Sequence, residues 1–381
     1  MNGFVMLAAG GTGGHLFPAE ALARELLALN ARVALVTDRR GKAFGESLPA
    51  VPVHRVSAAT LEPGLLGKLR TIAALAIGTW EARRLIKQHK PDVVVGFGGY
   101  PSLPAVMAAR LMGVPVVLHE QNAVLGRANR LMVRGARKLA ISFPIVSGLP
   151  DSCRDLVVRT GNPVRPGVAA VRDAFYTPPN GVGPIRLLVM GGSQGARVFS
   201  EVIPAALALL PETLRARLMI SQQCRPEDID GARAAYEGLG VGGVELQSFF
   251  HDVPNRLVGA HLVVCRAGAS TMSELTAVGR PGLLVPYPFA TDDHQTENAR
   301  SLAAAGGAWL MPQPDVALEN LAHRLEALLR NPADLALAAA VSRGWCVCDA
   351  AQRLAETVIE VACGPGPQAN CNCDLAREAV E

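Results

Sequence analysis

Two glycine-rich loops of this chain have the residue types and spacing of a ligand site. The first, Gly10–His15, directly follows the apolar run Phe4–Ala9, and the second, Gly191–Ala196, directly follows Ile185–Met190. Each pattern is typical of a buried strand that turns through glycines into the first turn of a helix. At such a turn, backbone N–H groups and the positive end of the helix dipole can bind an anion, most often a phosphate. Two copies predict a phosphorylated ligand in a cleft between two domains.

His15 ends the first loop, at the mouth of the predicted helix. A helix N-terminus disfavours the imidazolium, so we expect a neutral ring that can accept a proton. The alternative is a capped surface histidine with no chemical role.

Two further polar segments follow predicted strands. The cluster Gly96–Gly99 follows Val93–Val95, and His119–Asn122 places four polar residues in a row at the end of another strand. Ligands of parallel α/β sheets bind beyond the carboxyl ends of the strands. Plain turn chemistry would explain one such loop, but their repetition favours a polar binding site.

A comparable segment in the second half, Arg266–Glu274, follows the predicted strand Leu262–Cys265. Its small residues permit close approach of a diphosphate to a helix start, and Glu274 can accept both hydroxyls of a ribose. The alternative is an ordinary capping segment, with Ser270 as N-cap and Glu274 stabilising the first turn. Further along, Gln295 and Asn298 share one face of a predicted helix.

Strand-like runs alternate with alanine- and leucine-rich helical segments along the whole chain. This alternation predicts an α/β fold of two Rossmann-like parallel-sheet domains facing a cleft. The prolines and glycines of Thr160–Gly167 suggest the boundary. We expect a first domain over 1–162, a second over 163–344, a helix over about 345–361 that packs back on the first, and a poorly ordered tail over 364–381. The predicted strands are 4–8, 32–37, 93–95, 114–119, 138–141, 185–190, 217–221, 243–247, 262–265 and 282–285.

Composition narrows the function classes. A chain of 381 residues that is 50% hydrophobic and 18% charged suits two sheets covered by helices and excludes disorder. A net charge of +4 is too small to indicate a nucleic acid as partner. No apolar run is long enough to span a bilayer, and the first one is already strand-like, so we expect a mature cytoplasmic start.

Cofactor and metal signatures are incomplete. Nicotinamide-binding folds carry the glycine pattern G-x-G-x-x-G. Counted from Gly11 and Gly13, this pattern requires a glycine at position 16, where the chain has Leu16. Asp38, however, lies where the ribose-binding carboxylate of such folds would lie. The cysteine pairs 346/348 and 371/373 lack the two-residue spacer of zinc knuckles and have no nearby histidine. We therefore expect neither a cofactor nor a metal ion.

A stretch between residues 65 and 87 mixes apolar and basic side chains. This pattern suits a peripheral contact with an anionic membrane surface. A core-facing helix with solvated charges is the alternative. The residues are Leu65, Leu66, Leu69, Ile72, Leu75 and Trp80, interleaved with Lys68, Arg70, Arg83, Arg84 and Lys87.

Taken in order, these motifs resemble the MurG-type transferases, which add N-acetylglucosamine to undecaprenyl-pyrophosphoryl-MurNAc-pentapeptide (lipid I) to form lipid II. The resemblance spans roughly residues 4 to 360, and the ordered set is far more specific than any single motif. It comprises Gly10–His15, Gly98–Tyr100, His119–Asn122, Gly161–Arg165, Gly191–Ala196, Arg266–Glu274 and Asp292–Asn298.

The resemblance implies a GT-B glycosyltransferase architecture, with the lipid acceptor on the N-terminal domain and UDP-N-acetylglucosamine mainly on the C-terminal one. It implies one inverting displacement by the 4-hydroxyl of the muramyl sugar, without a metal ion. It also implies peripheral attachment at the cytoplasmic face of the cell inner membrane, and other cell-wall synthesis enzymes are candidate partners.

Carried over position by position, the family's catalytic base falls on His15. The acceptor-diphosphate loops contain Gly11, Gly98, Gly99 and Tyr100. On the donor, Glu274 would bind the ribose and Ser193 the diphosphate, and the whole set of matched positions is Thr12, Gly13, Gly14, Asn122, Arg165, Ser193, Phe250, Ala269, Ser270, Thr271, Met272, Ser273, Glu274 and Gln295.

Two rival functions remain open: another GT-B enzyme, such as a glycolipid synthase or a UDP-N-acetylglucosamine epimerase, and a scaffold that binds nucleotide sugar without catalysis. The chain departs from the family pattern in its tail, Cys363–Glu381, and in the acceptor loop Tyr100–Pro104. The second departure affects details of acceptor binding but not the donor site.

Overall fold

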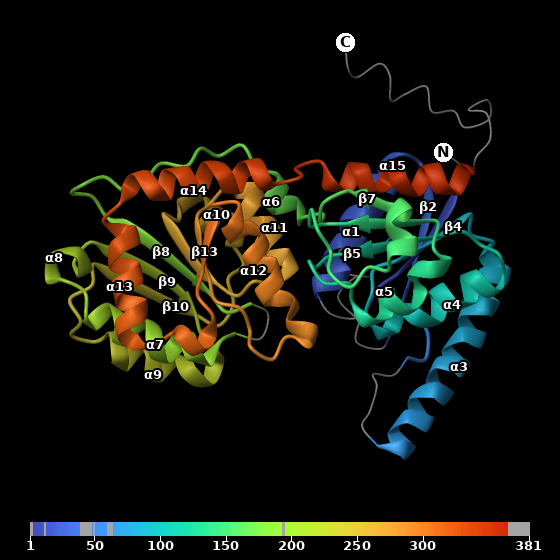
Figure 1. Cartoon of the computed structure of the whole chain (residues 1–381), viewed down its shortest axis with the longest axis horizontal. Coiled ribbons are helices and arrows are strands. Elements are labelled where there is room, and N and C mark those ends of the chain that lie inside the picture. The colour runs from blue at the N-terminus through green and yellow to red at the C-terminus, as the bar shows by residue number, and fades with distance from the viewer. Residues whose placement is uncertain are drawn as a thin grey trace, which may run out of the picture. The chain divides into compact units, whose positions relative to one another are not determined.

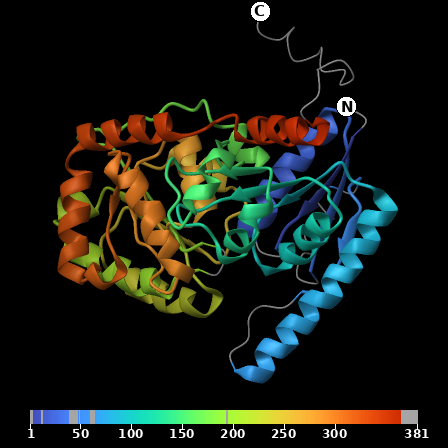
Figure 2. The same cartoon turned by 45° about the vertical axis from the view of Figure 1, so that its right-hand side comes forward.

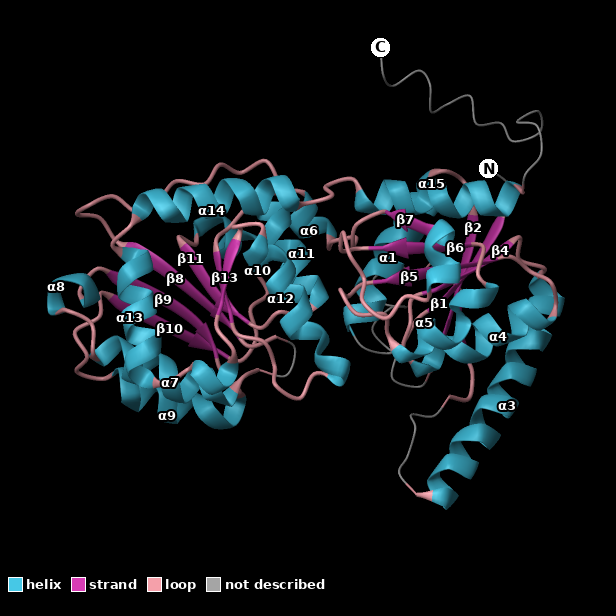
Figure 3. Ribbon diagram, in the orientation of Figure 1, coloured by secondary structure: helices cyan, strands magenta, loops and turns pink. Residues whose placement is uncertain are grey.

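The chain folds into two α/β units, as a computed structural model shows (Figures 1 and 3). Unit 1 comprises Met1–Pro163 and the segment from Asp349 onward, and unit 2 comprises Val164–Cys348. The structure describes residues 3–10, 13–38, 48, 50–58, 64–192 and 195–364.

Unit 1 is built on a seven-stranded parallel sheet in the order β3-β2-β1-β4-β5-β6-β7. The order reverses between β1 and β4, which pair directly, so the chain leaves the sheet in opposite directions on either side of this point. Ligand sites of doubly wound sheets lie at the carboxyl edge of such a reversal. The strands are β1 (Phe4–Ala8), β2 (Arg32–Thr37), β3 (Val53–Arg55), β4 (Val93–Gly96), β5 (Val116–Glu120), β6 (Lys138–Ile141) and β7 (Val157–Arg159).

Helices cover both faces of this sheet. Successive residues of β1 alternate between two cores: Val5 and Leu7 pack with α1 (Gly13–Ala28) and α15 (Ala350–Cys363), and Met6 packs on the opposite side. That opposite core includes residues of α3 (Leu65–His89), α4 (Leu103–Leu111) and the short segment after α5 (Arg127–Met132). Strands buried on both faces explain the continuous apolar runs in the sequence.

Helix α15 returns from the end of the chain to unit 1. Its residues Leu354, Ala355 and Val358 are buried in the same core as Leu22 and Leu26 of α1. The sequence predicted a helix over about 345–361; in the structure α14 ends at Trp345 and α15 begins at Ala350.

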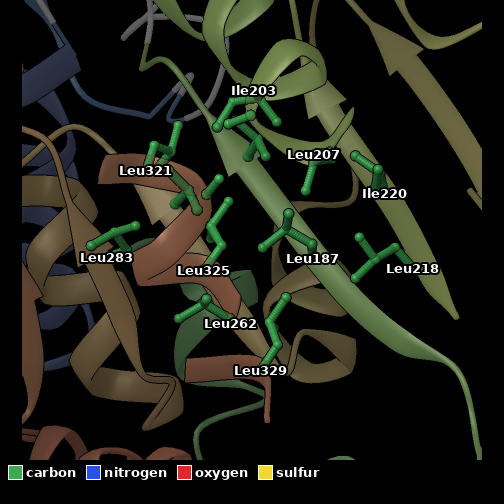
Figure 4. Packing of buried hydrophobic residues seen from close by; sticks show 14 of the residues in the cluster. Leu187, Ile203, Leu207, Leu218, Ile220, Leu262, Leu283, Leu321, Leu325 and Leu329 are labelled. Atoms are coloured by element: carbon green, nitrogen blue, oxygen red, sulfur yellow. The ribbon is translucent and has the colours of Figure 1, made fainter. Parts of the chain in front are cut away.

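Unit 2 repeats the arrangement on a six-stranded parallel sheet in the order β10-β9-β8-β11-β12-β13, with its reversal between β8 and β11. Leu187 of β8 packs with Ile203, Leu207, Leu325 and Leu329 in one core (Figure 4). The strands are β8 (Ile185–Met190), β9 (Leu218–Gln223), β10 (Gly243–Gln247), β11 (Leu262–Cys265), β12 (Gly282–Leu284) and β13 (Ala308–Leu310). The helices are α6 (Pro166–Ala169), α7 (Arg197–Ala208), α8 (Glu212–Arg215), α9 (Ile229–Tyr236), α10 (Val253–Gly259), α11 (Ala269–Val278), α12 (His294–Ala304), α13 (Leu318–Leu329) and α14 (Pro332–Trp345).

The predicted fold class, two Rossmann-like parallel-sheet domains, is confirmed. Every predicted strand is present within two residues of its expected bounds, and β1, β2, β6, β8, β10 and β11 have the bounds expected. The short strands β3, β7 and β13 were not predicted. Short 3-10 helices complete the described elements: η1 (Tyr100–Ser102), η2 (Val133–Gly135), η3 (Asp151–Leu156), η4 (Pro226–Asp228), η5 (Thr291–Asp293) and η6 (Gln313–Asp315).

Helix α3 is anchored through its second half. A Cβ atom on Gly78 would lie 1.9 Å from the carbonyl oxygen of Ser57, so only glycine permits this contact. The Glu81 carboxylate accepts a hydrogen bond from the Ser57 backbone N–H at 2.6 Å. The first half of α3 extends beyond the sheet of unit 1 (Figure 2). Among the described helices, none is long and apolar enough to cross a bilayer.

Candidate active site

The first glycine loop lies at the carboxyl edge of the unit 1 sheet, between β1 and α1. Gly11 and Thr12, both predicted ligand contacts, lie outside the described residues. Gly13 and Gly14 are the first two residues of α1, whose first turn contains no acidic side chain. A Cβ atom on Gly14 would meet nothing within 4 Å. The helix N-terminus therefore offers N–H groups to an anion without a competing carboxylate of its own first turn.

His15 lies in the first turn of α1, and glycines line its ring. A Cβ atom would lie 3.2 Å from the ring Cδ2 if placed on Gly10, and 3.3 Å from Nε2 if placed on Gly99. A Cβ atom on Gly98 would lie 3.7 Å from the ring Cε1. Gly98 and Gly99 adopt left-handed φ angles of +78° and +72°. The first and third glycine loops thus meet at this imidazole, and larger residues at these positions would crowd it.

The polar segment at the end of β5 meets the same imidazole. Nδ1 of His15 lies 3.2 Å from Oε1 of Gln121. Gln121 in turn donates from Nε2 to the Phe97 carbonyl oxygen at 2.9 Å, and the same nitrogen lies 3.0 Å from Nδ1 of His119. The structure therefore brings together the first glycine loop, the third glycine loop and the segment after β5, which the sequence predicted to lie at one sheet edge. Sequence analysis assigned no individual role to His119 or Gln121.

His119 is fully buried, and its Nε2 lies 3.1 Å from the Gly161 carbonyl oxygen. Burial lowers the pKa of His119 to about 4; the Gly161 hydrogen bond opposes this shift, and the charge of nearby His15 adds to it. The His119 ring is consequently neutral at physiological pH.

Glu120 organises the loop that carries Asn122. Its buried carboxylate accepts hydrogen bonds from the backbone N–H of Asn122 at 3.0 Å and of Gly126 at 2.8 Å. It also accepts one from Nδ2 of Asn129 at 2.8 Å. Asn122, a predicted donor contact, is thereby held next to Gln121, while Tyr100, from the predicted acceptor loop, is half-buried at the start of η1.

The second glycine loop occupies the equivalent place in unit 2, between β8 and α7. Ser193, the predicted diphosphate contact, lies outside the described residues. A Cβ atom on Gly191 would lie 2.3 Å from the backbone nitrogen of Ala196, so the loop folds back so tightly that only glycine is accommodated. The first turn of α7 contains no acidic residue. The start of α7 therefore resembles that of α1 in having no carboxylate in its first turn to compete with an anion.

Arg165 and Glu274, which the sequence matched to separate donor contacts, bind each other. Nε and one terminal nitrogen of Arg165 donate to the two carboxylate oxygens of Glu274 at 2.6 and 2.8 Å. Burial alone would lower the pKa of Arg165, but the hydrogen bonds and charge of Glu274 raise it overall. The two hydrogen bonds hold the Glu274 carboxylate in place at the second turn of α11.

The capping interpretation of residues 270–274 is wrong in detail. Gly268, not Ser270, occupies the N-cap of α11, because its backbone is extended while helical geometry begins at Ala269. Ser270 Oγ is buried without a hydrogen-bond partner among the described residues, and Ser273 Oγ donates to the Ala269 carbonyl oxygen at 2.8 Å. Met272 is fully buried, Ala269 is buried and Thr271 is half-buried, so the Met272 side chain packs in the core.

Gln295 and Asn298 share a helix face as predicted, and both bind the turn after β11. Oε1 of Gln295 accepts hydrogen bonds from the backbone N–H of Ala267 at 3.2 Å and of Tyr287 at 3.0 Å. Nδ2 of Asn298 donates to the Ala267 carbonyl oxygen at 2.9 Å. These contacts fix the position of the α11 start relative to α12.

Phe250 is buried, and the guanidinium of Arg256 lies 4.0 Å from its ring centroid. Arg256 is itself held by Glu245, with one terminal nitrogen 2.7 Å from a carboxylate oxygen. The Phe250 ring is therefore part of the core. Within the described ranges, no group of three or more His, Cys, Asp or Glu side chains could hold a metal ion.

Comparison with known proteins places this geometry in a family. The model of the glycosyltransferase family 28 N-terminal domain matches residues 5–141, and that of the glycosyltransferase family 28 C-terminal domain matches residues 186–358. Two relatives carry the name UDP-N-acetylglucosamine–N-acetylmuramyl-(pentapeptide) pyrophosphoryl-undecaprenol N-acetylglucosamine transferase. The one from Rhodospirillum centenum is 59% identical over 94% of both chains. The one from Paramagnetospirillum magneticum is 52% identical over 93% of this chain and 96% of its own length.

Solved structures agree. The crystal structure of MurG from Acinetobacter baumannii is 30% identical, with a TM-score of 0.78 over 94% of this chain and 99% of that one. The calicheamicin glycosyltransferase CalG4, 15% identical with a TM-score of 0.66, shares the fold over 96% of this chain and all of its own. The chain therefore belongs to glycosyltransferase family 28, among its MurG-type members.

Proposed function

We propose that this protein transfers N-acetylglucosamine from UDP-N-acetylglucosamine to the 4-hydroxyl of the muramyl sugar in lipid I, forming lipid II for peptidoglycan. The relatives are named for the transfer of N-acetylglucosamine to this lipid, and the match at 59% identity over 94% of both chains is the observation that carries the proposal. The polar edges of both sheets, each with a glycine loop opening into a helix, support it because both substrates are diphosphate esters.

The donor binds unit 2 through its nucleotide. The N–H groups at the starts of α7 and α11 face the diphosphate, and Glu274 accepts the ribose hydroxyls while Arg165 remains beside it. Backbone groups at Phe250 receive the uracil, and Gln295 lies toward the donor sugar. The other proposed donor contacts are Ala269, Ser270, Thr271, Met272 and Ser273, together with Ser193 outside the described residues.

The acceptor binds unit 1. The diphosphate of the lipid lies against the glycine loops at Gly98, Gly99 and Tyr100, and at Gly11, which lies outside the described residues. Thr12, also outside them, acts with Gly13, Gly14 and Asn122 on the donor sugar. Of these residues, Gly98 and Gly99 line the His15 imidazole.

The reaction is a single displacement with inversion. The acceptor oxygen forms a bond to C1 of the α-linked sugar while the bond from C1 to the diphosphate oxygen breaks, and that electron pair leaves with UDP. The hydroxyl proton passes to His15, which acts as general base. Helix N-termini, loop amides and Arg165 compensate the charge of the leaving group, so the mechanism requires no divalent ion.

We further propose that the protein attaches peripherally to the cytoplasmic face of the inner membrane through α3. Among its predicted anchors with described side chains, Leu69, Ile72 and Trp80 are exposed by 56, 62 and 53%. Arg84 stacks on the Trp80 ring at 3.6 Å, next to exposed Arg83 and Lys87. Exposed apolar side chains beside cations suit an anionic lipid surface, where the lipid acceptor resides. Other cell-wall synthesis enzymes are the protein partners that this location offers.

The test is transfer of radiolabelled N-acetylglucosamine from UDP to a lipid I analogue in the presence of EDTA. We expect labelled lipid product and free UDP in equal amounts. UDP binding without labelled lipid would identify a scaffold instead. Epimerisation of UDP-N-acetylglucosamine in the absence of the acceptor would identify an epimerase.

A further inference from the structure

We propose that Gln121, oriented by buried His119, sets the tautomer of His15, with the proton on Nδ1 and the lone pair on Nε2. The proposal deepens the role of His15 as base and rests on that proposed function. Gln121 and His119 are positioning residues in this scheme, because they act on the acceptor hydroxyl only through His15.

Two backbone carbonyl groups fix the direction of every hydrogen bond in this network, since a carbonyl oxygen can only accept. The Gly161 oxygen, 3.1 Å from Nε2 of His119, requires that nitrogen to carry a proton. Because the His119 ring is neutral, its Nδ1 then carries a lone pair and accepts from Nε2 of Gln121 at 3.0 Å.

The Phe97 carbonyl oxygen fixes the Gln121 amide in the same way. It accepts the second proton of the amide nitrogen at 2.9 Å, and a flipped amide would instead place two oxygens against each other. Oε1 of Gln121 is therefore the atom that faces His15. Since Oε1 can only accept, Nδ1 of His15, 3.2 Å away, must donate.

The lone pair of the neutral His15 ring consequently lies on Nε2, the nitrogen that faces Gly99. This is the nitrogen beside the loops proposed to bind the acceptor, so the lone pair is directed to the side from which a hydroxyl approaches. Burial keeps the network in place, because Gln121 is only 2% exposed and His119 is fully buried. If His119 were protonated, its Nδ1 could no longer accept the hydrogen bond from Gln121. The neutral state of His119 is therefore required for the orientation of the Gln121 amide.

The experiment is ¹⁵N NMR of the full chain labelled at its eight histidines, with the His15 signals assigned from a His15→Gln variant. The two ring nitrogens resonate at different positions according to which is protonated. We expect a protonated Nδ1 and a bare Nε2 for His15, the reverse of the form that free histidine favours. Protonated Nε2 in the neutral ring of the wild type would overturn the proposal, and this readout needs no variant of Gln121.

Gln121→Met provides the second arm. It should return His15 toward the Nε2–H form and lower kcat about tenfold, the worth of one hydrogen bond, with the UDP dissociation constant unchanged. Gln222→Met in unit 2 is the matched control: Gln222 is also fully buried, donates to the Phe199 carbonyl oxygen and accepts from Tyr236. It should leave the His15 tautomer as in the wild type. An unchanged tautomer in Gln121→Met would also overturn the proposal.

A different experiment tests the proposed role of His15 as the base. If His15→Ala keeps full turnover, His15 is not the base, whatever tautomer the NMR spectrum reports.

Discussion

Arg165 and Glu274, 109 residues apart in the chain, form a bidentate ion pair in unit 2. The Glu274 side chain is 8% exposed and the Arg165 side chain 31%, so the carboxylate is the more deeply buried partner. It joins the segment before α6 to the second turn of α11, and it holds the proposed ribose acceptor in one orientation. Preorganisation of this kind spares the ligand the cost of ordering a flexible side chain.

The pair should contribute to the stability of the chain. In a double-mutant cycle with Arg165→Met and Glu274→Gln, we expect a coupling in the unfolding free energy of about 0.5–3 kcal/mol, the range for residues in direct contact. Urea titrations of the four proteins provide the measurement. Strictly additive effects would show that the contact contributes nothing.

Glu274→Gln should also weaken UDP binding by about 10- to 100-fold, because a hydrogen bond to a charged acceptor contributes about 1.5–3 kcal/mol. Isothermal titration calorimetry measures the effect. Glu326→Gln, at a half-buried position of α13 in the same unit, is the control and should bind UDP as the wild type does. Unchanged affinity in Glu274→Gln would remove Glu274 from the donor site.

Membrane attachment through α3 should depend on single apolar side chains. Ile72→Asp should lower binding to anionic vesicles at least about tenfold, because burying an isoleucine side chain is worth about 1.5–3 kcal/mol. Leu337→Asp in α14 is the matched control, since Leu337 is 66% exposed but lies in unit 2. Sedimentation at low and high salt measures both variants, and binding should fall as salt rises. Equal losses in the two variants would argue against a specific role of α3.

Acid should destabilise the chain through His119. The unfolded ring gains a proton below its ordinary pKa of 6.5, whereas the folded ring stays neutral down to about 4. The unfolded state thus binds more protons in this window, so the unfolding free energy falls as the pH is lowered from 6.5 to 4, by roughly 3 kcal/mol at most. Urea titrations at pH 7 and 5 should show that the unfolding free energy of His119→Gln falls less than that of the wild type. The same loss in both proteins would assign the acid sensitivity to other groups.

The sequence predicted the sheets well because their central strands are buried on both faces. Such strands read as continuous apolar runs, as in Phe4–Ala8 and Ile185–Met190, and their bounds were correct. The strands that it missed lie at sheet edges, such as Val53–Arg55 and Ala308–Leu310. An edge strand of only three residues shows too little hydrophobic periodicity to be recognised from the sequence.

The site was predictable only in part. Parallel strands bring their carboxyl ends to one edge, so the grouping of the loops around His15 and His119–Asn122 followed from the sequence. Contacts between individual side chains did not. Gln121 meets His15 across 106 residues, and neither residue carries a local signal of the other. Likewise, the burial of Met272 in the core depends on packing around α11 that no short motif encodes.

The proposed mechanism depends on His15, whose imidazole removes the proton from the acceptor hydroxyl. The most direct measurement is the rate of labelled sugar transfer to a lipid I analogue by His15→Ala, with UDP affinity measured on the same sample. We expect a kcat lower by about 10²–10⁴-fold with UDP affinity unchanged. A variant that binds UDP normally and transfers the sugar at the wild-type rate would contradict this mechanism.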